Sequence, residues 1–296
     1  MLKRKRRSRV DLITDIVFIV LLILISLIAL YPLWFVLIAS VSDPLAIARG
    51  EVIFWPKDIN FSAYKTLLDN SRIWIGYRNS LFYLFAGSFA TLAVTLPAAY
   101  ALSRTKLKGR KVINFLFIVS MYFTGGIVPT YLLHQSIGWL DTIWVMIIPS
   151  SLNVYYMILA RSSFDSLPET MYEAAAIDGA NDFRYFFQFA LPLCKATIAV
   201  LFLFSALSWW NEYMRFVIYI DDPNKQSLQV IIQELTQTLS SSLSESMTPD
   251  QILEFEREKE LLKYSVVVVA ALPFCLLYPF IQKYFNRGVM VGAIKG

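Results

Sequence analysis

The chain has 296 residues, 57% of them hydrophobic and 17% charged, and a formal net charge of +5. Soluble domains carry about 25% charged residues, so this composition excludes an ordinary soluble protein and indicates an integral membrane protein. Lys and Arg gather at the ends of long apolar segments, where residues that set membrane topology lie. The positive charge is therefore not evidence for a nucleic-acid partner, and we expect none.

Six segments are long and apolar enough to cross a membrane as helices, which takes about 20 residues. They are residues 14–40, 79–103, 112–133, 141–160, 196–220 and 263–285. Because helices satisfy their own backbone groups in lipid, the sequence predicts an all-α membrane protein with six transmembrane helices. These form one domain, residues 14–285, between a basic tail at 1–13 and a C-terminal tail at 286–296. The start resembles a signal peptide, but its apolar run exceeds about 15 residues, so we expect it to remain as the first helix.

The distribution of basic residues predicts the orientation of the chain. The first tail, the run at 104–111, the loop at 161–195 and the residues from 283 onward lie on one side and carry seventeen Lys and Arg in total. The intervening segments on the other side carry nine. The positive-inside rule then places both termini in the cytoplasm and loops 42–78 and 221–262 outside.

The cytoplasmic loop at 161–195 contains an acidic, alanine-rich stretch, ETMYEAAAIDGANDF. Ser166 and Glu169 have the spacing of a capping box, which predicts that a helix begins there. Consecutive alanines favour that helix, and Gly179 is expected to end it because glycine readily adopts the left-handed conformation. A second short helix is expected to follow and to end at Pro192.

These two short helices would form a projection that suits docking to another protein. The alanines allow a close approach, and Glu173 and Asp178 offer charges to a cationic partner. The alternative is a helix that lies on the membrane surface, but such helices usually carry Lys and Arg on their polar face. The sequence thus favours a protein-docking segment between the fourth and fifth helices.

The same stretch resembles the signature of permeases of binding-protein-dependent ABC importers: E-A-A, three residues, G, nine residues, then I-x-L-P. The matching residues are Glu173, Ala174, Ala175, Gly179, Leu191 and Pro192, with Phe189 in place of the isoleucine. Further stretches resemble the carbohydrate-uptake permeases, most closely those for oligosaccharides and polysaccharide fragments, including uronate- and rhamnose-containing ones. These stretches are AAYALSR, GGIVPTYLL, WWNEY and the ending GVMVGAIKG. Ser227 and Ala196 depart from this subgroup, which usually has proline at both positions.

The resemblance implies partners and coupling residues. Such permeases work in the bacterial cytoplasmic membrane with a homologous but non-identical second permease, two ATPase subunits that bind ATP and Mg, and an extracytoplasmic sugar-binding protein. The projection would be the coupling helix, seated on an ATPase subunit through Glu173, Ala174, Ala175, Asp178, Gly179, Leu191 and Pro192. The tail residues Gly292, Lys295 and Gly296 would reach between the ATPase subunits. The alternative for the tail is a frayed terminus.

The sequence of the chain contains no catalytic or metal-binding motif. It has no phosphate-binding loop of the form GxxxxGK[ST], no zinc-ligand spacing and no Ser-His-Asp set. ATP hydrolysis is therefore expected in other subunits, no cofactor is expected in this chain, and the lone His134 is expected to be a surface residue. The alternative function is a secondary transporter driven by an ion gradient. Such a protein would require ionisable residues in mid-membrane and internal repeats, neither of which the sequence shows.

Polar and aromatic residues within the predicted spans are candidates for a substrate path, because such residues face the interior of a bundle or water. They are Asn153, Tyr156, Trp210, Asn211 and Glu212. Each has a structural alternative: a tryptophan in an interfacial belt, an asparagine in an inter-helix hydrogen bond, and Glu212 paired with Arg215. Interruptions of the kind found in substrate paths are expected in the second, third and fourth helices, at Pro97, Gly125, Gly126, Pro129 and Pro149.

Overall fold

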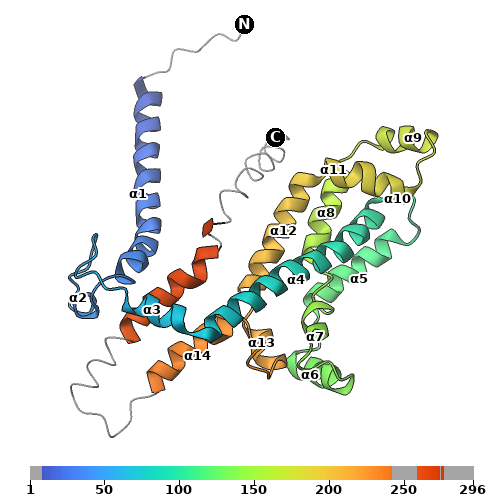
Figure 1. Ribbon diagram of the computed structural model, residues 1–296. Helices are drawn as coiled ribbons and strands as arrows, with labels where there is room; N and C mark the ends of the chain where they lie inside the picture. Colours follow the sequence, from blue (N-terminus) through green and yellow to red (C-terminus); the bar gives the residue numbers. More distant parts are fainter. Residues whose placement is uncertain (1–8, 242–258, 274, 277–296) are drawn as a thin grey trace. The chain divides into compact units, whose positions relative to one another are not determined.

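The computed structural model describes residues 9–241, 259–273 and 275–276, and every regular element among them is helical (Figure 1). This confirms the predicted all-α class. The chain divides into two compact units. One comprises residues 1–69 and 235–272, and the other comprises residues 70–234 and 273–296.

The first unit contains the long apolar helix α1 (Arg9–Ala39), α2 (Pro44–Ala48), α3 (Ser62–Asp69) and the helical residues 259–272. The C-terminal end of α1 packs against the last of these. The Phe35 and Tyr264 rings meet edge to face at 5.9 Å, and Ser265 Oγ donates a hydrogen bond to the Ser40 carbonyl at 3.1 Å. The most apolar stretch of α1 has no residue buried by this chain. A helix that is apolar all round lies against lipid or another chain.

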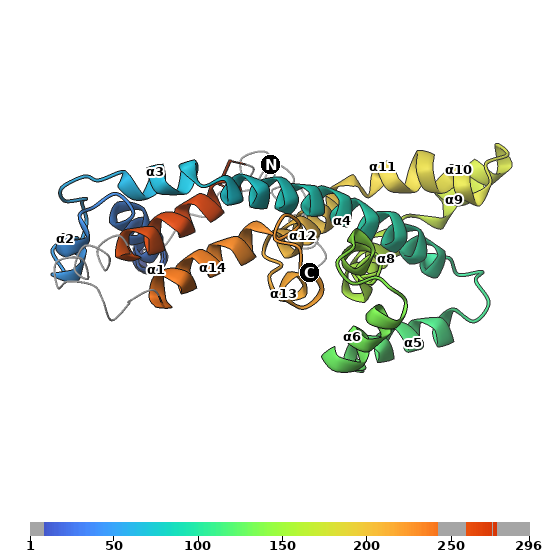
Figure 2. The same ribbon diagram turned by 60° about the horizontal axis from the view of Figure 1, so that its bottom comes forward.

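The second unit is built on α4 (Ser71–Ser103), which packs along α8 (Val154–Asp165) and α12 (Lys195–Trp210). Figure 1 and Figure 2 show these three helices side by side. The shorter elements are α5 (Arg110–Tyr122), α6 (Ile127–Ser136), α7 (Ile143–Ile147), α9 (Glu169–Ile177), α10 (Asp182–Tyr185), a π-helical turn (Phe186–Ala190), α11 (Leu191–Leu193), α13 (Met214–Tyr219) and α14 (Leu228–Ser241), whose last residues belong to the first unit.

A glycine lets α4 approach α12 closely. Gly87 is buried in α4, and a Cβ built at this position would overlap the indole ring of Trp209 in α12. Trp209 is 3% exposed and stacks on Tyr83, one turn before Gly87. One turn after Gly87, Thr91 Oγ1 donates hydrogen bonds to the carbonyls of Gly87 and Ser150. The contact between these two helices therefore depends on the absence of a side chain at position 87.

We expect Gly87→Val to lower the free energy of unfolding by about 1–3 kcal/mol, the usual cost of inserting extra methyl groups into a filled core. Valine at this position must displace the Trp209 ring or separate α4 from α12. Thermal unfolding of the purified chain in detergent measures the effect as a lower Tm. Gly125→Val is the matched control, because no atom lies within 4 Å of a Cβ built at Gly125. An equal loss in the two variants would contradict the packing argument.

Two of the described helices, Ile13–Ala39 within α1 and Ser71–Ser103 as α4, are each long and apolar enough to cross a membrane. They correspond to the predicted spans 14–40 and 79–103, although α4 begins earlier than predicted. Two helix pairs also meet the criterion together but are bent, α5 with α6 by 106° and residues 182–193 with α12 by 81°. The total of six spans stays a prediction, and residues 274 and 277–285 of the sixth lie outside the described residues.

The third, fourth and fifth predicted spans are each divided between two helices, which was predicted for the third and fourth but not for the fifth. Residues 112–133 break between α5 and α6, where Gly126 has a φ of +85°. Residues 141–160 break between α7 and α8, beside Pro149, and residues 196–220 divide into α12 and α13. The first two breaks lie where the glycines and Pro149 predicted them. Pro97, in contrast, lies inside α4 without ending it, so the interruption predicted there is wrong.

The two predicted outside loops contain more helix than expected. Loop 42–78 includes α2, α3 and the first two turns of α4. In loop 221–262, α14 begins just after Ser227, whose Oγ accepts a hydrogen bond from the Val230 amide at 3.4 Å. Ser227 thus satisfies a backbone donor at the start of α14, which a proline side chain would not do. Residues 242–258 lie outside the described part of the chain.

His134 is buried, so its prediction as a surface residue is wrong. Only 5% of it is exposed, and its ring centroid lies 5.1 Å from that of Tyr219 and 6.1 Å from that of Trp139. The contact with Tyr219 joins α6 to α13, two elements that are distant in the sequence. Composition alone gives no sign of such a contact.

Candidate functional site

Residues 169–193 form a projection at one end of the second unit, which we call the paired-helix segment. It follows α8 and leads directly into α12, so both of its ends are joined to main helices. Figure 1 shows α9 and α10 at the opposite end of α8 and α12 from α7 and α13. The coupling residues predicted between Glu173 and Pro192 all lie in this segment.

Gly179 ends α9 as predicted. Its φ is +79°, in the left-handed region. The amide of Gly179 donates to the Ala176 carbonyl at 3.0 Å, and the Ala180 amide donates to the Ala175 carbonyl at 2.9 Å. This pair of hydrogen bonds is the Schellman motif, which satisfies the last carbonyls of a helix. Asn181 then caps α10, because its Oδ1 accepts from the Arg184 amide at 2.8 Å.

The predicted boundaries on either side of this turn need correction. Ser166 does not cap α9. It lies in the last turn of α8, its Oγ donates to the Ser163 carbonyl at 2.7 Å, and α9 begins after Pro168 without a side-chain cap. The second helix runs from α10 through the π-helical turn into α11 and ends at Leu193, one residue after the predicted end at Pro192, where the chain bends into α12.

The outer face of the paired-helix segment is open and combines acidic with apolar side chains. Glu173, Ala174 and Asp178 are exposed. Ile177 and Phe183 are 87% and 76% exposed, which is unusual for large apolar side chains outside a membrane span. Within the described part of the chain, neither Glu173 nor Asp178 forms an ion pair. This face is therefore available to a partner.

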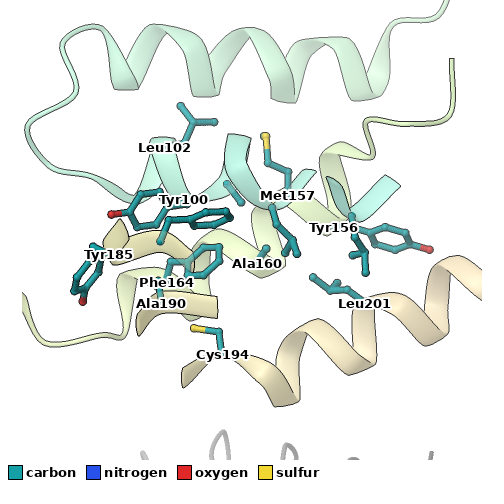
Figure 3. Close-up of a cluster of buried hydrophobic side chains, with 14 of the residues drawn as sticks. Tyr100, Leu102, Tyr156, Met157, Ala160, Phe164, Tyr185, Ala190, Cys194 and Leu201 are labelled. Atoms are coloured by element: carbon teal, nitrogen blue, oxygen red, sulfur yellow. The ribbon is translucent and has the colours of Figure 1, made fainter. Parts of the chain in front are cut away.

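The inner face of the segment is anchored in a hydrophobic cluster shared with α4 and α8 (Figure 3). Ala175 and Ala190 are both buried there. The Tyr100 ring of α4 meets Phe164 of α8 at 5.7 Å and Phe186 of the π-helical turn at 5.0 Å. Leu191 packs at the edge of the same cluster, whereas Pro192 is exposed. Side chains of the paired-helix segment, α4 and α8 thus share one close-packed core.

A second anchor joins the end of α4 to both short helices. The Arg104 guanidinium lies 3.5 Å from the centre of the Tyr172 ring. The Tyr172 hydroxyl donates a hydrogen bond to Asp182 Oδ1 at 3.1 Å, and the Tyr172 and Tyr185 rings meet edge to face at 5.1 Å. Sequence reasoning missed this contact between Arg104 and Tyr172. It assigned Arg104 to the basic run that sets topology and to the stretch AAYALSR, neither of which indicates a contact with Tyr172.

The candidate path residues on α8 have structural partners within the chain. Asn153 caps α8, because its Oδ1 accepts from the Tyr156 amide at 3.0 Å. Tyr156 is 8% exposed, and its hydroxyl lies 3.3 Å from Ser208 Oγ on α12. The Asn153 backbone amide also donates to Thr95 Oγ1 on α4 at 3.4 Å, so both Asn153 and Tyr156 take part in inter-helix hydrogen bonds.

The candidate path residues at the end of α12 also have contacts within the chain. Trp210 is 3% exposed and lies 6.1 Å from the Tyr77 ring, so it presents no open ring face. Asn211 ends α12, and its Nδ2 donates to the Leu207 carbonyl of its own helix at 2.9 Å. Glu212 forms the predicted ion pair with Arg215. The tail residues Gly292, Lys295 and Gly296 lie outside the described residues.

Comparison with known proteins gives consistent matches. The family model "Binding-protein-dependent transport system inner membrane component" matches residues 73–291. The polygalacturonan/rhamnogalacturonan transport system permease protein YtcP of Bacillus subtilis (strain 168) is 33% identical, over 90% of this chain and 92% of that protein. The maltodextrin transport system permease protein MdxG of the same organism is 28% identical, over 79% and 80%. A solved chain of a bacterial ABC transporter involved in import of the acidic polysaccharide alginate is 33% identical with a TM-score of 0.83, covering 95% of this chain and 99% of that one.

Proposed function

This chain belongs to the family of binding-protein-dependent transport system inner membrane components, and we propose that it passes an oligosaccharide or polysaccharide fragment across the bacterial cytoplasmic membrane within an ATP-driven importer. Its family places it among multi-pass transport permeases rather than enzymes or ion-driven secondary transporters. The relatives described for polygalacturonan/rhamnogalacturonan, maltodextrin and alginate support carbohydrate as the substrate class. The family name supports a binding protein as the source of the substrate.

The open face of the paired-helix segment is the observation that carries the coupling mechanism. We infer that Glu173, Ala174, Asp178, Ile177 and Phe183 seat in a cleft of an ATPase subunit on the cytoplasmic side, with both termini of the chain on that side. Gly179 sets the angle between α9 and α10, while Ala175 and Leu191 hold the segment on its base. Pro192 lies near the bend that leads into α12.

Coupling follows from differential contact. ATP and Mg bound by the ATPase subunits would close them and move the seated face, and the shared hydrophobic cluster would carry that motion into α4 and α8. The closed ATPase pair shifts the pathway only as far as its contacts favour one conformation of the permease over the other. The complete importer in this proposal has this chain, a homologous second permease, two ATPase subunits and an extracytoplasmic sugar-binding protein. The C-terminal residues Gly292, Lys295 and Gly296 would contact the ATPase pair.

ATP hydrolysis by the assembly that co-purifies with this chain tests the proposal. The assembly is reconstituted in lipid with and without sugar-loaded binding protein. Hydrolysis that the loaded binding protein stimulates is the expected result. A chain that purifies without an ATPase and a second permease would instead favour the ion-driven transporter.

Reversing the charge at position 173 should weaken the hold on the ATPase. We expect Glu173→Lys to reduce the ATPase that co-purifies more strongly than Glu173→Gln, because the lysine repels cationic groups that the glutamine merely fails to attract. Glu51→Lys, a charge reversal at an exposed site in loop 42–78, is the control and should change nothing. Equal retention in the two position-173 variants would show that the charge of Glu173 is irrelevant.

A further inference from the structure

A pocket of about 490 Å³ lies between the C-terminal end of α4 and the paired-helix segment. One wall of the pocket is apolar and includes Pro97, Ala101 and Phe186. The rim of the pocket carries Arg104 and Lys106. The pocket lies within the second unit and adjoins the anchor between Arg104 and Tyr172. Phe183 lines the pocket and also belongs to the open face, whereas Glu173, Ala174 and Ile177 do not line it. The proposed coupling mechanism makes no use of the pocket itself.

The two cations at the rim have no anionic partner within the described residues. The Arg104 guanidinium lies 3.5 Å from the centre of the Tyr172 ring, and Lys106 lies 5.9 Å from the same ring. The pocket's carboxylate, Asp182, accepts a hydrogen bond from the Tyr172 hydroxyl. Two nearby arginines differ from this pair, since Arg110 and Arg161 both form ion pairs with Asp165 at 3.3 Å. The rim therefore offers an oriented guanidinium and an ammonium to an anion.

The apolar wall extends from this rim along a membrane-crossing helix. Pro97 and Ala101 lie on successive turns of one face of α4, and Arg104 is the capping residue at its C-terminal end, so the wall begins about 10 Å along the helix from Arg104. A soluble protein that docks at the rim would not be expected to insert an apolar side chain so far along this wall. An amphiphile, in contrast, matches both parts of the pocket, with charge at the membrane surface and hydrocarbon below it.

We propose that this pocket binds an anionic phospholipid. Its phosphate lies between Arg104 and Lys106, and an acyl chain lies against Pro97, Ala101 and Phe186. Basic pockets beside membrane helices on the cytoplasmic side are a common place for acidic headgroups. Because the bound lipid contacts both α4 and the π-helical turn, it also supports the base of the paired-helix segment. The proposal concerns lipid binding alone and holds whatever substrate the chain transports.

Lipid binding to the full-length chain, purified with the subunits that accompany it and stripped of lipid by detergent exchange, tests the proposal. Native mass spectrometry counts bound phosphatidylglycerol against phosphatidylcholine of the same acyl chains. We expect a preference for phosphatidylglycerol. Lys106→Gln should weaken its binding about fivefold, as expected for one basic residue near an anionic surface. Arg104→Gln combined with Lys106→Gln should remove the preference, and Ala101→Trp should fill the wall and reduce the binding of both lipids.

Lys108→Gln is the matched control, because Lys108 is an exposed lysine of the same basic run that does not line the pocket. It should leave binding within about twofold of the original. An equal loss of binding in the Lys108 and Lys106 variants would show that a diffuse positive field, and not the pocket, attracts the lipid. Equal binding of the two lipids would show that the site does not select an anionic headgroup. Displacement of the lipid by glycerol phosphate at the same concentration would show a site for free phosphate compounds instead. A pocket filled by a side chain of an accompanying subunit would give no lipid preference at all, which also overturns the proposal.

Discussion

Uptake is expected to be lost when Gly179 is replaced by valine, although the chain still reaches the membrane. Gly179 has a φ of +79°, and a β-branched residue in this region costs about 1–2 kcal/mol. No atom lies within 4 Å of a Cβ at this position, so the strain stays in the turn and the core is not disturbed. The turn relaxes by changing the angle between α9 and α10, which moves the docking face away from the ATPase. Uptake of labelled substrate, normalised to the amount of chain in the membrane, measures the loss.

Gly109→Val is the matched control for this prediction. Gly109 precedes α5, has the same φ of +79°, and also has no atom within 4 Å of an added Cβ. It lies outside the paired-helix segment, so uptake should remain in this variant. Gly179→Asn should retain part of the activity, because asparagine tolerates the left-handed region better than valine. Normal uptake with Gly179→Val would remove the coupling role of the turn.

Ile177→Asp should release the ATPase subunit. Ile177 is 87% exposed in this chain, so its side chain contributes little to folding but is free to fill an apolar cleft in a partner. Buried anchors of this kind typically contribute about 2 kcal/mol or more to binding, which corresponds to roughly a thirtyfold change in Kd. A carboxylate at the same point also has to be desolvated on docking. The Kd between the purified permease and the ATPase measures the effect.

Ile59→Asp provides the control, since Ile59 is also a well-exposed isoleucine, at 63%, but lies in loop 42–78. This variant should bind the ATPase normally. Both variants should unfold at the temperature of the original chain, because neither residue is packed in a core. An unchanged Kd with Ile177→Asp would move the docking face away from α9.

The short helix α9 and its end were predictable from the sequence because they depend on local chemistry. Alanines favour the helix, and Gly179 supplies the one conformation that the Schellman motif needs. The start of α9 was not predictable from the same kind of evidence. Ser166 and Glu169 have the spacing of a capping box, but α8 continues to Asp165 and uses Ser166 in its own last turn. A local motif fails when a neighbouring helix already occupies the residue.

Contacts between distant segments account for most of what the sequence did not reveal. The contact of Arg104 with Tyr172 and the burial of His134 both depend on how helices pack, and no motif in the sequence indicates either of them. The spans were predicted from length and apolar character, and the glycines and Pro149 predicted the breaks in the third and fourth. The break between α12 and α13, at residues 211–213, contains neither glycine nor proline and was not predicted. The family, in contrast, was predictable, because the motif from Glu173 to Pro192 is confirmed by the match over residues 73–291.

The π-helical turn at Phe186–Ala190 makes the direction of the docking face depend on the number of residues between α10 and α12. The Leu191 amide bonds to the Phe186 carbonyl, five residues back, so the turn holds one residue more than an α-helical turn. One residue corresponds to a rotation of about 100°. A chain shortened by one residue here would form a regular helix with all of its hydrogen bonds, yet it would present Phe183 on a different side of α10 relative to α12. In this segment the number of residues, as much as their identity, determines the position at which the partner binds.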